Sequence, residues 1–448
     1  MKRIENHVSA IKDAARKYFL GGDDAGILQL CGGTGMGKTA AARHYVKIHG
    51  GYYFSFRHLD AAIAPQIFLP GSRDWDAFFK IIAKRKNRPV IFFDDTDDRN
   101  DKDIFFSKLS SLHRKAFVVL LCRGEMKLDI PYTVLQLKPV TLPELLAKSK
   151  QLDQMNALRL IAMTDGNPGL LSAYDTERSF AENLRCFFTE GSAFLRHGPE
   201  ELSRHFRSPE SYNTLLYGMA TGHNRIVQLA EFSGYPKNKC DKYLKALDAA
   251  GFIETARKED ENGQLRTHYY PKGAYLKIWY RLYFPYRERF AQTLSDEALE
   301  ELLTQIDDIA AKPYFRSLCR QWMARFGQQF YCENKISLNT PTQREVTVNG
   351  CGFDFVQHDR NNTLYMKIWD DLKTGFPKEL FRQIETATTA ARPFYDNFYF
   401  LFSVLRPCNY VEALQKHENM IVITLGSLLS KNSEELFSDV QRSYARIK

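Results

Sequence analysis

The sequence predicts a mixed α/β chain of about three domains that begins with a parallel sheet. Its 448 residues suggest that number at about 150 residues per domain. Short apolar runs at 27–31, 89–93 and 116–122 alternate with helix-forming segments, as in a sheet that helices cover. Helices with a hairpin follow them, and the last third alternates further strands with a helix. We expect three domains in this order along the chain, at 1–205, 206–292 and 293–448.

The composition is that of an ordinary globular protein. Hydrophobic residues make up 44% and charged residues 26%, which excludes a long disordered chain or a collagen-like repeat. The net charge of +9 is compatible with a polyanionic partner but does not establish one. The eight cysteines form no CxxC pair, so neither a zinc site nor a disulfide framework is predicted. Charges interrupt the N-terminal apolar runs, and no run approaches the roughly 18 residues of a membrane span, so we expect a cytoplasmic protein without a membrane partner.

A glycine-rich segment after the first apolar run fits the pattern GxxxxGK[ST] at every fixed position. It comprises Gly32, Gly33, Thr34, Gly35, Met36, Gly37, Lys38 and Thr39, and the helix-forming residues from Ala40 follow it. In a strand, loop and helix of this kind, backbone N–H groups and the helix N-terminus surround phosphates. Lys38 is predicted to neutralise the β- and γ-phosphates, and the Thr39 hydroxyl is predicted to bind Mg²⁺. Residues 32–40 are therefore predicted to bind ATP with Mg²⁺.

Acidic residues follow the second apolar run, at the sheet edge where parallel sheets bind ligands. We predict that Asp94 acts on the magnesium ion, mostly through water. Asp95 is the candidate group for orienting the attacking water. Asp97 and Asp98 fit a solvated acidic loop better than a set of metal ligands.

The third apolar run ends in Arg123, which can contact the γ-phosphate and report its presence. A surface arginine in a loop is an equally good interpretation. Arg114, before the same run, is a second candidate, for an arginine that acts on a neighbouring subunit of a homo-oligomer. Residues 166–169, Gly-Asn-Pro-Gly, interrupt a helical region, and their Gly and Pro can simply cap and start helices.

The middle of the chain predicts a winged helix-turn-helix. Three segments with helical spacing precede two strand-like segments that flank a turn-rich loop, at 209–220, 225–233, 238–250, 252–258 and 264–270. The third helix would enter the major groove of double-stranded DNA with four nearby lysines, Lys237, Lys239, Lys242 and Lys245. Between residues 237 and 289, seven Lys and five Arg face three Asp and four Glu, a local net charge of +5. A protein-contact module remains a comparable alternative. The aromatic segment 275–290 favours core packing over base stacking.

Taken together, residues 32–39, IFFDDTDD, LLCRG, residues 137–145 and GNPG resemble the archaeal-type ATPases of the AAA+/STAND group of P-loop NTPases, the DEXX-box ATPases. The resemblance implies a P-loop NTPase parallel sheet with a helical lid, and ATP hydrolysis. It makes Arg123 the sensor of the γ-phosphate and Pro168 the lid residue that contacts the nucleotide. The sequence departs from the family where Cys122 replaces a small hydroxyl residue and Asp95 replaces Glu, and the family's N-terminal motif is reduced to residues 3–5. These departures favour nucleotide binding over rapid hydrolysis.

The last third of the chain occupies the position of a restriction-endonuclease-like domain of the PD-(D/E)xK kind in that family. Strands are predicted at 344–348, 352–356, 363–368, 398–405 and 420–424, with helices at 314–326 and 378–391. Asp354 matches the first Asp of the nuclease motif, but the next strand lacks acid-x-Lys. It offers Tyr365 before Lys367, or Met366 before Ile368, and Arg316 stands where a Glu often follows Phe315. Because divalent cations need several oxygen ligands, we predict an inactive nuclease fold. The alternative is that Asp359, Asp370 or Asp371 replaces the missing acid.

These elements predict a nucleotide-driven switch: an ATP-binding, Mg²⁺-dependent P-loop ATPase coupled to a winged helix that binds DNA. One alternative is an ATP-regulated scaffold that binds proteins and no nucleic acid. The other alternative is an active Mg²⁺-dependent DNA nuclease.

Overall fold

The computed structural model describes most of the chain, and the description below is confined to that part. The described residues are 2–21, 26–56, 82, 88–96, 109, 115–149, 151–259, 263–291, 294–333, 343–358, 362–392, 396–414, 419–430 and 433–447. They fall into two compact units. The first unit comprises 1–140, 167–173 and 199–208, and the second comprises 141–166, 174–198 and 209–448. The predicted Asp97, Asp98, Arg114 and Asp359 lie outside the described residues.

The first unit is built on a five-stranded sheet in which every pair of neighbouring strands is parallel. The strand order is β2 (Tyr52–Ser55), β3 (Val90–Asp94), β4 (Phe117–Cys122), β1 (Ile27–Cys31) and β5 (Tyr132–Gln136). The three central strands are buried along their whole length, which explains their continuous apolar sequences. The mixed α/β class with a parallel sheet typical of P-loop NTPases is therefore confirmed.

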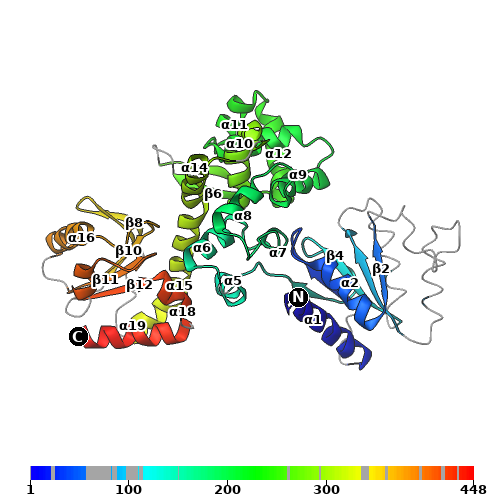
Figure 1. Ribbon diagram of the computed structural model, residues 1–448, viewed down its shortest axis with the longest axis horizontal. Helices are drawn as coiled ribbons and strands as arrows, with labels where there is room; N and C mark the ends of the chain where they lie inside the picture. The colour runs from blue at the N-terminus through cyan, green and yellow to red at the C-terminus, as the bar shows by residue number, and fades with distance from the viewer. Residues whose placement is uncertain are drawn as a thin grey trace. The chain divides into compact units, whose positions relative to one another are not determined.

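Helices α1 (Lys2–Phe19) and α2 (Lys38–His49) pack on one face of this sheet (Figure 1). Alternate strand residues such as Leu28 and Leu30 join one face's apolar core with Ile11 of α1 and Ala41 of α2. The intervening residues, among them Ile27, form a separate apolar core on the opposite face. Because the strands run parallel, the carboxyl ends of β1, β3 and β4 lie at one edge of the sheet.

The second unit begins with helices and continues into a three-helix segment with a hairpin. Its first helices are α5 (Leu142–Lys148), α6 (Gln154–Met163) and α8 (Phe180–Phe187). The segment that follows contains α10 (Glu210–Ala220), α11 (Ile226–Ser233), α12 (Lys237–Ala249) and the antiparallel strands β6 (Ile253–Glu259) and β7 (Leu265–Pro271). These helices and strands lie where the sequence predicts them. The short α7 (Pro168–Leu171) and the last residues of α9 (Ala193–His205) belong to the first unit.

Polar contacts tie α6 to later parts of the second unit. Asp165, just after α6, accepts hydrogen bonds from the backbone N–H groups of Ala274 and Tyr275, at the start of α13 (Gly273–Ile278). Burial raises the pKa of this carboxyl group. Arg159 binds both carboxylate oxygens of Asp307 at 2.8 Å. Asp307 begins the π-helix η5 (Asp307–Ala311), after α14 (Asp296–Ile306).

The first half of the aromatic segment after the hairpin packs in the core, as predicted, whereas Tyr286 in its second half is exposed. It continues from α13 into the π-helix η3 (Trp279–Tyr283) and the 3-10 helix η4 (Phe284–Ala291). Tyr275, Trp279 and Tyr280 are buried. The Trp279 Nε1–H donates to the Leu195 carbonyl at 2.9 Å, so the polar end of the indole is satisfied.

The C-terminal part of the second unit contains a mixed five-stranded sheet. Its order is β12 (Met420–Thr424), β11 (Asp396–Ser403), β10 (Asn362–Trp369), β9 (Cys351–His358) and β8 (Gln343–Val348). Strands β8, β9 and β10 pair antiparallel, and β10, β11 and β12 pair parallel. The helices of this part are α15 (Lys312–Glu333), α16 (Lys378–Ala391), α17 (Asn409–Leu414), α18 (Leu425–Ser430) and α19 (Ser433–Ile447). Phe381 and Ile384 of α16 pack with Tyr365 of the sheet.

The helices of the described residues include none that is both long and apolar enough to cross a membrane.

Candidate functional site

A cavity of about 260 Å³ opens at the carboxyl edge of the parallel sheet in the first unit. Seven consecutive residues of the glycine-rich segment, Thr34 to Ala40, form one wall. The other lining residues are Asp94, Asp95, Leu121, Arg123 and Arg204. The fold thus brings together most of the residues that the sequence assigns to the phosphate loop, and the candidate groups that follow β3 and β4.

The phosphate loop holds its lysine against its own backbone. Gly37 precedes α2 with a left-handed φ of 93°, and α2 begins at Lys38. The Lys38 Nζ donates to the carbonyls of Gly32 and Gly33, at 3.0 Å for Gly33. The ammonium therefore lies across the mouth of the loop, where the sequence predicts that phosphates bind. For the ammonium, these two carbonyl acceptors can be exchanged for phosphate oxygens, which carry more negative charge.

Oxygen groups from three elements meet beside the loop. The hydroxyl groups of Thr39 on α2 and Tyr53 on β2 each donate to Asp94 Oδ2 at 2.6 Å. The Asp94 side chain is buried. Burial and the hydrogen bond to Asp94 raise the pKa of the Tyr53 phenol, so it remains a donor at neutral pH. Sequence analysis did not identify Tyr53, because an aromatic residue in a strand indicates core packing and nothing more specific.

This donor set fits a magnesium ion. A carboxylate and hydroxyl groups are oxygen ligands, which hard divalent cations prefer. Thr39 and Asp94 are the two residues that the sequence assigns to the metal, and the fold places their oxygens in direct contact.

Asp95 has an unusual backbone conformation. Its φ is +57°, which is uncommon for a residue other than glycine and is often found at functional sites. Its carboxylate accepts a hydrogen bond from Ser55 Oγ of β2 at 2.8 Å, and its N–H donates to Asp94 Oδ1 at 2.9 Å. These contacts fix Asp95 on the cavity wall, in contact with Asp94.

A cluster of charged groups lies beside Arg123 on the cavity wall. The Glu201 carboxylate of α9 lies 3.8 Å from Arg123 Nε, 3.5 Å from Arg204 Nη1 and 3.5 Å from His205 Nε2. Arg204 Nη1 also donates to the Thr34 hydroxyl at 3.1 Å. Arg123 Nη1 lies 3.3 Å from His205 Nδ1. Arg123 lines the cavity, and its contact with a γ-phosphate stays a prediction.

Sequence analysis missed Arg204 and Glu201. They lie about eighty residues beyond β4 on an amphipathic helix, where charged residues ordinarily face solvent. No motif marks them.

The turn after α6 touches the phosphate loop. Asn167 Nδ2 donates to the Thr34 carbonyl at 2.8 Å, and the Gly169 N–H donates to the Gly35 carbonyl at 2.9 Å. Asn167 also caps α7 by accepting from the Gly169 and Leu170 N–H groups. Pro168 occupies the first turn of α7 and does not line the cavity among the described residues, so its contact with the nucleotide stays a prediction.

A buried glutamine supports the loop that follows Arg123. The Gln29 side chain of β1 bonds both the Met126 carbonyl, at 2.6 Å, and the Met126 N–H, at 2.8 Å. Cys122 is buried, and its sulfur lies 3.8 Å from Gln29 Oε1. The strand end before Arg123 is therefore held from within the sheet.

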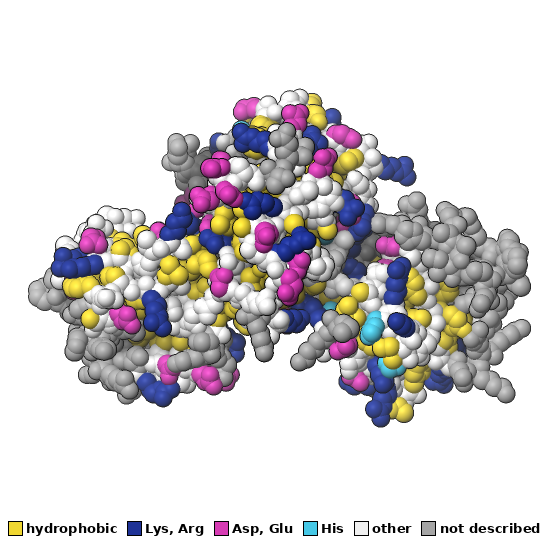
Figure 2. Space-filling view, in the orientation of Figure 1, with side chains coloured by type: hydrophobic (Ala, Val, Ile, Leu, Met, Phe, Trp, Pro, Cys, Tyr) yellow, Lys and Arg dark blue, Asp and Glu magenta, His cyan; other side chains and the backbone are white. Residues whose placement is uncertain are grey.

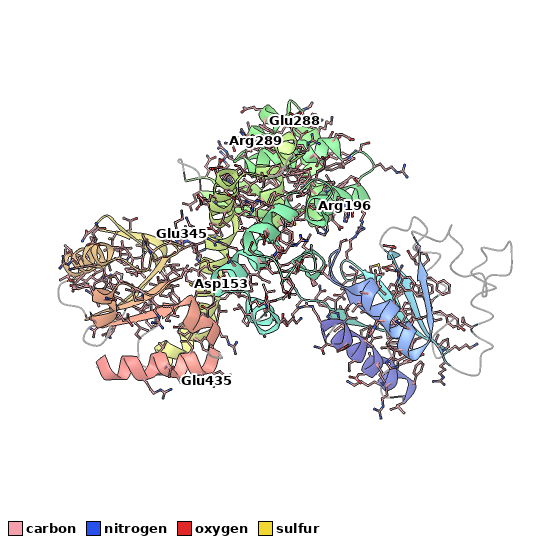
Figure 3. All side chains as sticks on the ribbon, in the orientation of Figure 1. Asp153, Arg196, Glu288, Arg289, Glu345 and Glu435 are labelled. Carbon is pink, nitrogen blue, oxygen red and sulfur yellow. The ribbon has the colours of Figure 1, made fainter. Side chains whose placement is uncertain are left out.

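In the second unit, an arginine contacts the acids of the predicted nuclease site. Arg316 Nη1 lies 2.9 Å from Asp354 Oδ1, and Arg316 Nε lies 2.9 Å from Asp370 Oδ2. Asp354 Oδ2 accepts from the Ile368 N–H at 2.8 Å. Arg320, which pairs with Glu345 (labelled in Figure 3), also lies 3.8 Å from Asp354.

The remaining candidates of that site are engaged elsewhere. Asp371 accepts from the N–H groups of Lys373 and Thr374 in a turn, and the Lys367 Nζ donates to the Gly352 carbonyl. Among the described residues, no group of three or more His, Cys, Asp or Glu side chains is arranged to hold a metal ion.

Comparisons with known proteins give distant likenesses. No model of a protein family matches the chain. The chain is 21% identical over 367 residues to an uncharacterized protein of Methanocaldococcus jannaschii, covering 76% of this chain and 80% of that protein. A solved Walker-type ATPase of Pyrococcus abyssi matches with a TM-score of 0.43 and 15% identity, over 61% of this chain and 95% of the other.

The ORC1 protein of Aeropyrum pernix, solved in complex with DNA, matches with a TM-score of 0.35 and 14% identity, over 67% of this chain and 92% of the other. The assignment of the first sheet to the P-loop NTPase type therefore rests on the parallel strands and the loop of this chain itself.

Proposed function

We propose that this chain is an ATP-binding, Mg²⁺-dependent P-loop ATPase of the AAA+/STAND group that acts as a nucleotide-driven switch. One observation carries the proposal: a single cavity is lined by the phosphate loop, Lys38, the Thr39–Asp94 pair and Arg123. Loop N–H groups, an ammonium, metal-binding oxygens and a guanidinium are what a magnesium triphosphate requires.

In this proposal, Thr39 and Asp94 hold the magnesium ion, with the carboxylate acting mostly through water. The ion supplies neutralisation of the phosphate charge. Tyr53 orients the Asp94 carboxylate by its hydrogen bond. Asp95 orients the attacking water, and its short side chain, held by Ser55, fits slow hydrolysis.

The switch is read out by the residues around the terminal phosphate. Arg123 senses that phosphate, and the turn at 166–169 follows the loop through its contacts with Thr34 and Gly35. Because α6 immediately precedes this turn, a shift of the loop would be passed along the chain to it. We propose that residues 1–205 act as the ATPase domain with its lid, and 206–292 and 293–448 as effector domains.

The experiment that tests nucleotide binding is titration calorimetry of the chain with ATP in the presence of Mg²⁺. Binding with one site per chain is expected, and it should weaken when Mg²⁺ is removed with a chelator. If ATP produces no binding heat at several temperatures, the proposed function is wrong.

We further propose that α10–α12 with the β6–β7 hairpin form a winged helix-turn-helix that contacts double-stranded DNA. The α12 face carries exposed Lys242, whereas Lys245 is paired with Asp241 at 2.7 Å. Figure 2 shows basic and acidic side chains interspersed over the visible face of this part. Such a surface can contact the phosphate backbone of DNA, and it offers no evident set of side chains that would recognise a base sequence.

DNA binding is predicted to fall steeply with salt, since each phosphate contact releases counterions. When electrophoretic mobility shifts are measured across a salt series, Lys242→Ala should weaken DNA binding. It should also reduce the slope of log affinity against log salt concentration by about one. Lys47→Ala, which removes an exposed lysine of α2 outside this segment, is the matched control and should leave the slope unchanged. Absence of binding even at low salt would favour the alternative of an ATP-regulated scaffold that binds proteins.

We also propose that the C-terminal domain, with its resemblance to PD-(D/E)xK nucleases, is inactive. The Arg316 guanidinium forms ion pairs with both Asp354 and Asp370. The two carboxylates that a divalent cation would need as ligands are therefore already paired with a positive charge. Plasmid DNA should stay intact after long incubation with the chain and Mg²⁺. Cleavage that disappears in Asp354→Ala would instead establish the nuclease alternative, with Asp370 as the second acid.

A further inference from the structure

One carboxylate faces three basic side chains behind the phosphate loop. Glu201 lies within 4 Å of Arg123, Arg204 and His205, as described above, and its side chain is only 17% exposed. The two arginines line the cavity, whereas Glu201 does not. Glu201 contacts the arginines that line the cavity, and we expect it to act on a bound molecule through them.

The charge of this carboxylate persists over the working range of pH. Burial acts to raise the pKa of Glu201, but hydrogen bonds from His205 and Thr34 and the charges of Arg123 and Arg204 outweigh it and lower the pKa to about 2. Two guanidiniums on one cavity wall would repel each other without such a partner, because like charges in a partly buried site are poorly screened.

Glu201 contacts the two arginines at moderate distances. Its distances of 3.8 Å to Arg123 and 3.5 Å to Arg204 exceed those of tight charge-assisted hydrogen bonds, which are about 2.7–2.9 Å. A guanidinium has five N–H donors in a fixed planar fork, which is more than a single carboxylate can accept. Arg204 is fixed on another side by the Thr34 hydroxyl of the loop.

We propose that Glu201 is a positioning residue that keeps Arg123 and Arg204 together on the cavity wall by reducing their mutual repulsion, so that the pair binds the terminal phosphate of a nucleoside triphosphate and discriminates it from a diphosphate. The proposal deepens the ATP site proposed above and rests on it. A diphosphate still engages Lys38 and the loop, but it lacks the phosphate that the pair would bind. Helix α9 thereby adds specificity for a triphosphate to the phosphate loop, which is far from it in the sequence.

The test compares the affinities for ATP and ADP, with Mg²⁺, of the wild-type chain and Glu201→Gln. Gln keeps the shape and removes the charge, so the preference for ATP over ADP should fall roughly tenfold, while ADP affinity stays within about twofold. A side chain with a merely structural role would change both affinities together. Arg204→Ala is a second variant, which removes one arginine of the pair and should lower the ratio of ATP affinity to ADP affinity as well. It provides the test if Glu201→Gln folds poorly.

Two further variants give the control and the coupling. Glu200→Gln removes the neighbouring charge on α9. The Glu200 side chain is 55% exposed and lies 3.9 Å from Arg204, and its substitution should leave the ratio of ATP affinity to ADP affinity unchanged. In the background of Arg204→Ala, Glu201→Gln should add less than it does alone, because it acts through that arginine.

The outcomes separate this proposal from the proposed function. If the wild-type chain binds neither nucleotide, the ATP site itself is wrong. If the wild-type chain binds ATP but Glu201→Gln and Arg204→Ala leave the ATP-to-ADP preference unchanged, or Glu200→Gln lowers it as much, then Glu201 has no positioning role and the ATP site stands.

Discussion

Lys38→Ala is expected to weaken binding of ATP with Mg²⁺ by at least about a hundredfold, to below detection in calorimetry. The Lys38 ammonium lies against two carbonyls at the mouth of the loop, and no other lysine lines the cavity among the described residues. Removing it leaves the phosphates without their central positive charge, which the backbone N–H groups of the loop cannot replace.

The matched control is Lys47→Ala, which removes an exposed lysine from the last turn of the same helix and should bind ATP like the wild-type chain. Thermal unfolding of both variants checks that α2 is retained. Undiminished binding by a folded Lys38→Ala chain would remove Lys38 from the site.

Gly35→Ala is expected to lower both the stability of the first unit and its affinity for ATP. Gly35 has a φ of +82°, a conformation that costs a residue with a Cβ about 1–3 kcal/mol. The added Cβ would also lie 2.3 Å from Asn167 Oδ1, far inside van der Waals contact. Asn167 is held by Thr34 and by the start of α7, so either the loop or the turn at 166–169 must move.

Gly33→Ala provides a sharp comparison in the same loop. A Cβ on Gly33 would meet no atom within 4 Å, and its φ is not in the left-handed region. We expect its thermal midpoint to match the wild-type value, while that of Gly35→Ala falls by several degrees. If the two substitutions lowered the thermal midpoint equally, the contact between the turn at 166–169 and the loop would not constrain the site.

The sequence alone determined the phosphate loop and much of the sheet around it. Residues 32–39 are a continuous motif between a buried strand and a helix, so their geometry depends on local conformation, with glycine at the left-handed positions. Asp94 was equally accessible to prediction, because an acid that ends a continuous apolar run must lie at the carboxyl edge of a parallel sheet. The three helices and the hairpin of the middle segment also follow from local periodicity and turn chemistry.

Only the tertiary structure decided which distant side chains complete these sites. Tyr53 reaches Asp94 because β2 lies next to β3, and Glu201 reaches Arg123 because the last residues of α9 belong to the same compact unit as the loop. Likewise, Arg316 meets Asp354 and Asp370 across elements that are 38 to 54 positions apart in the chain. Such contacts form when faces of helices and sheets are buried against each other. An amphipathic pattern predicts that a face is buried, but it does not predict which element packs against that face.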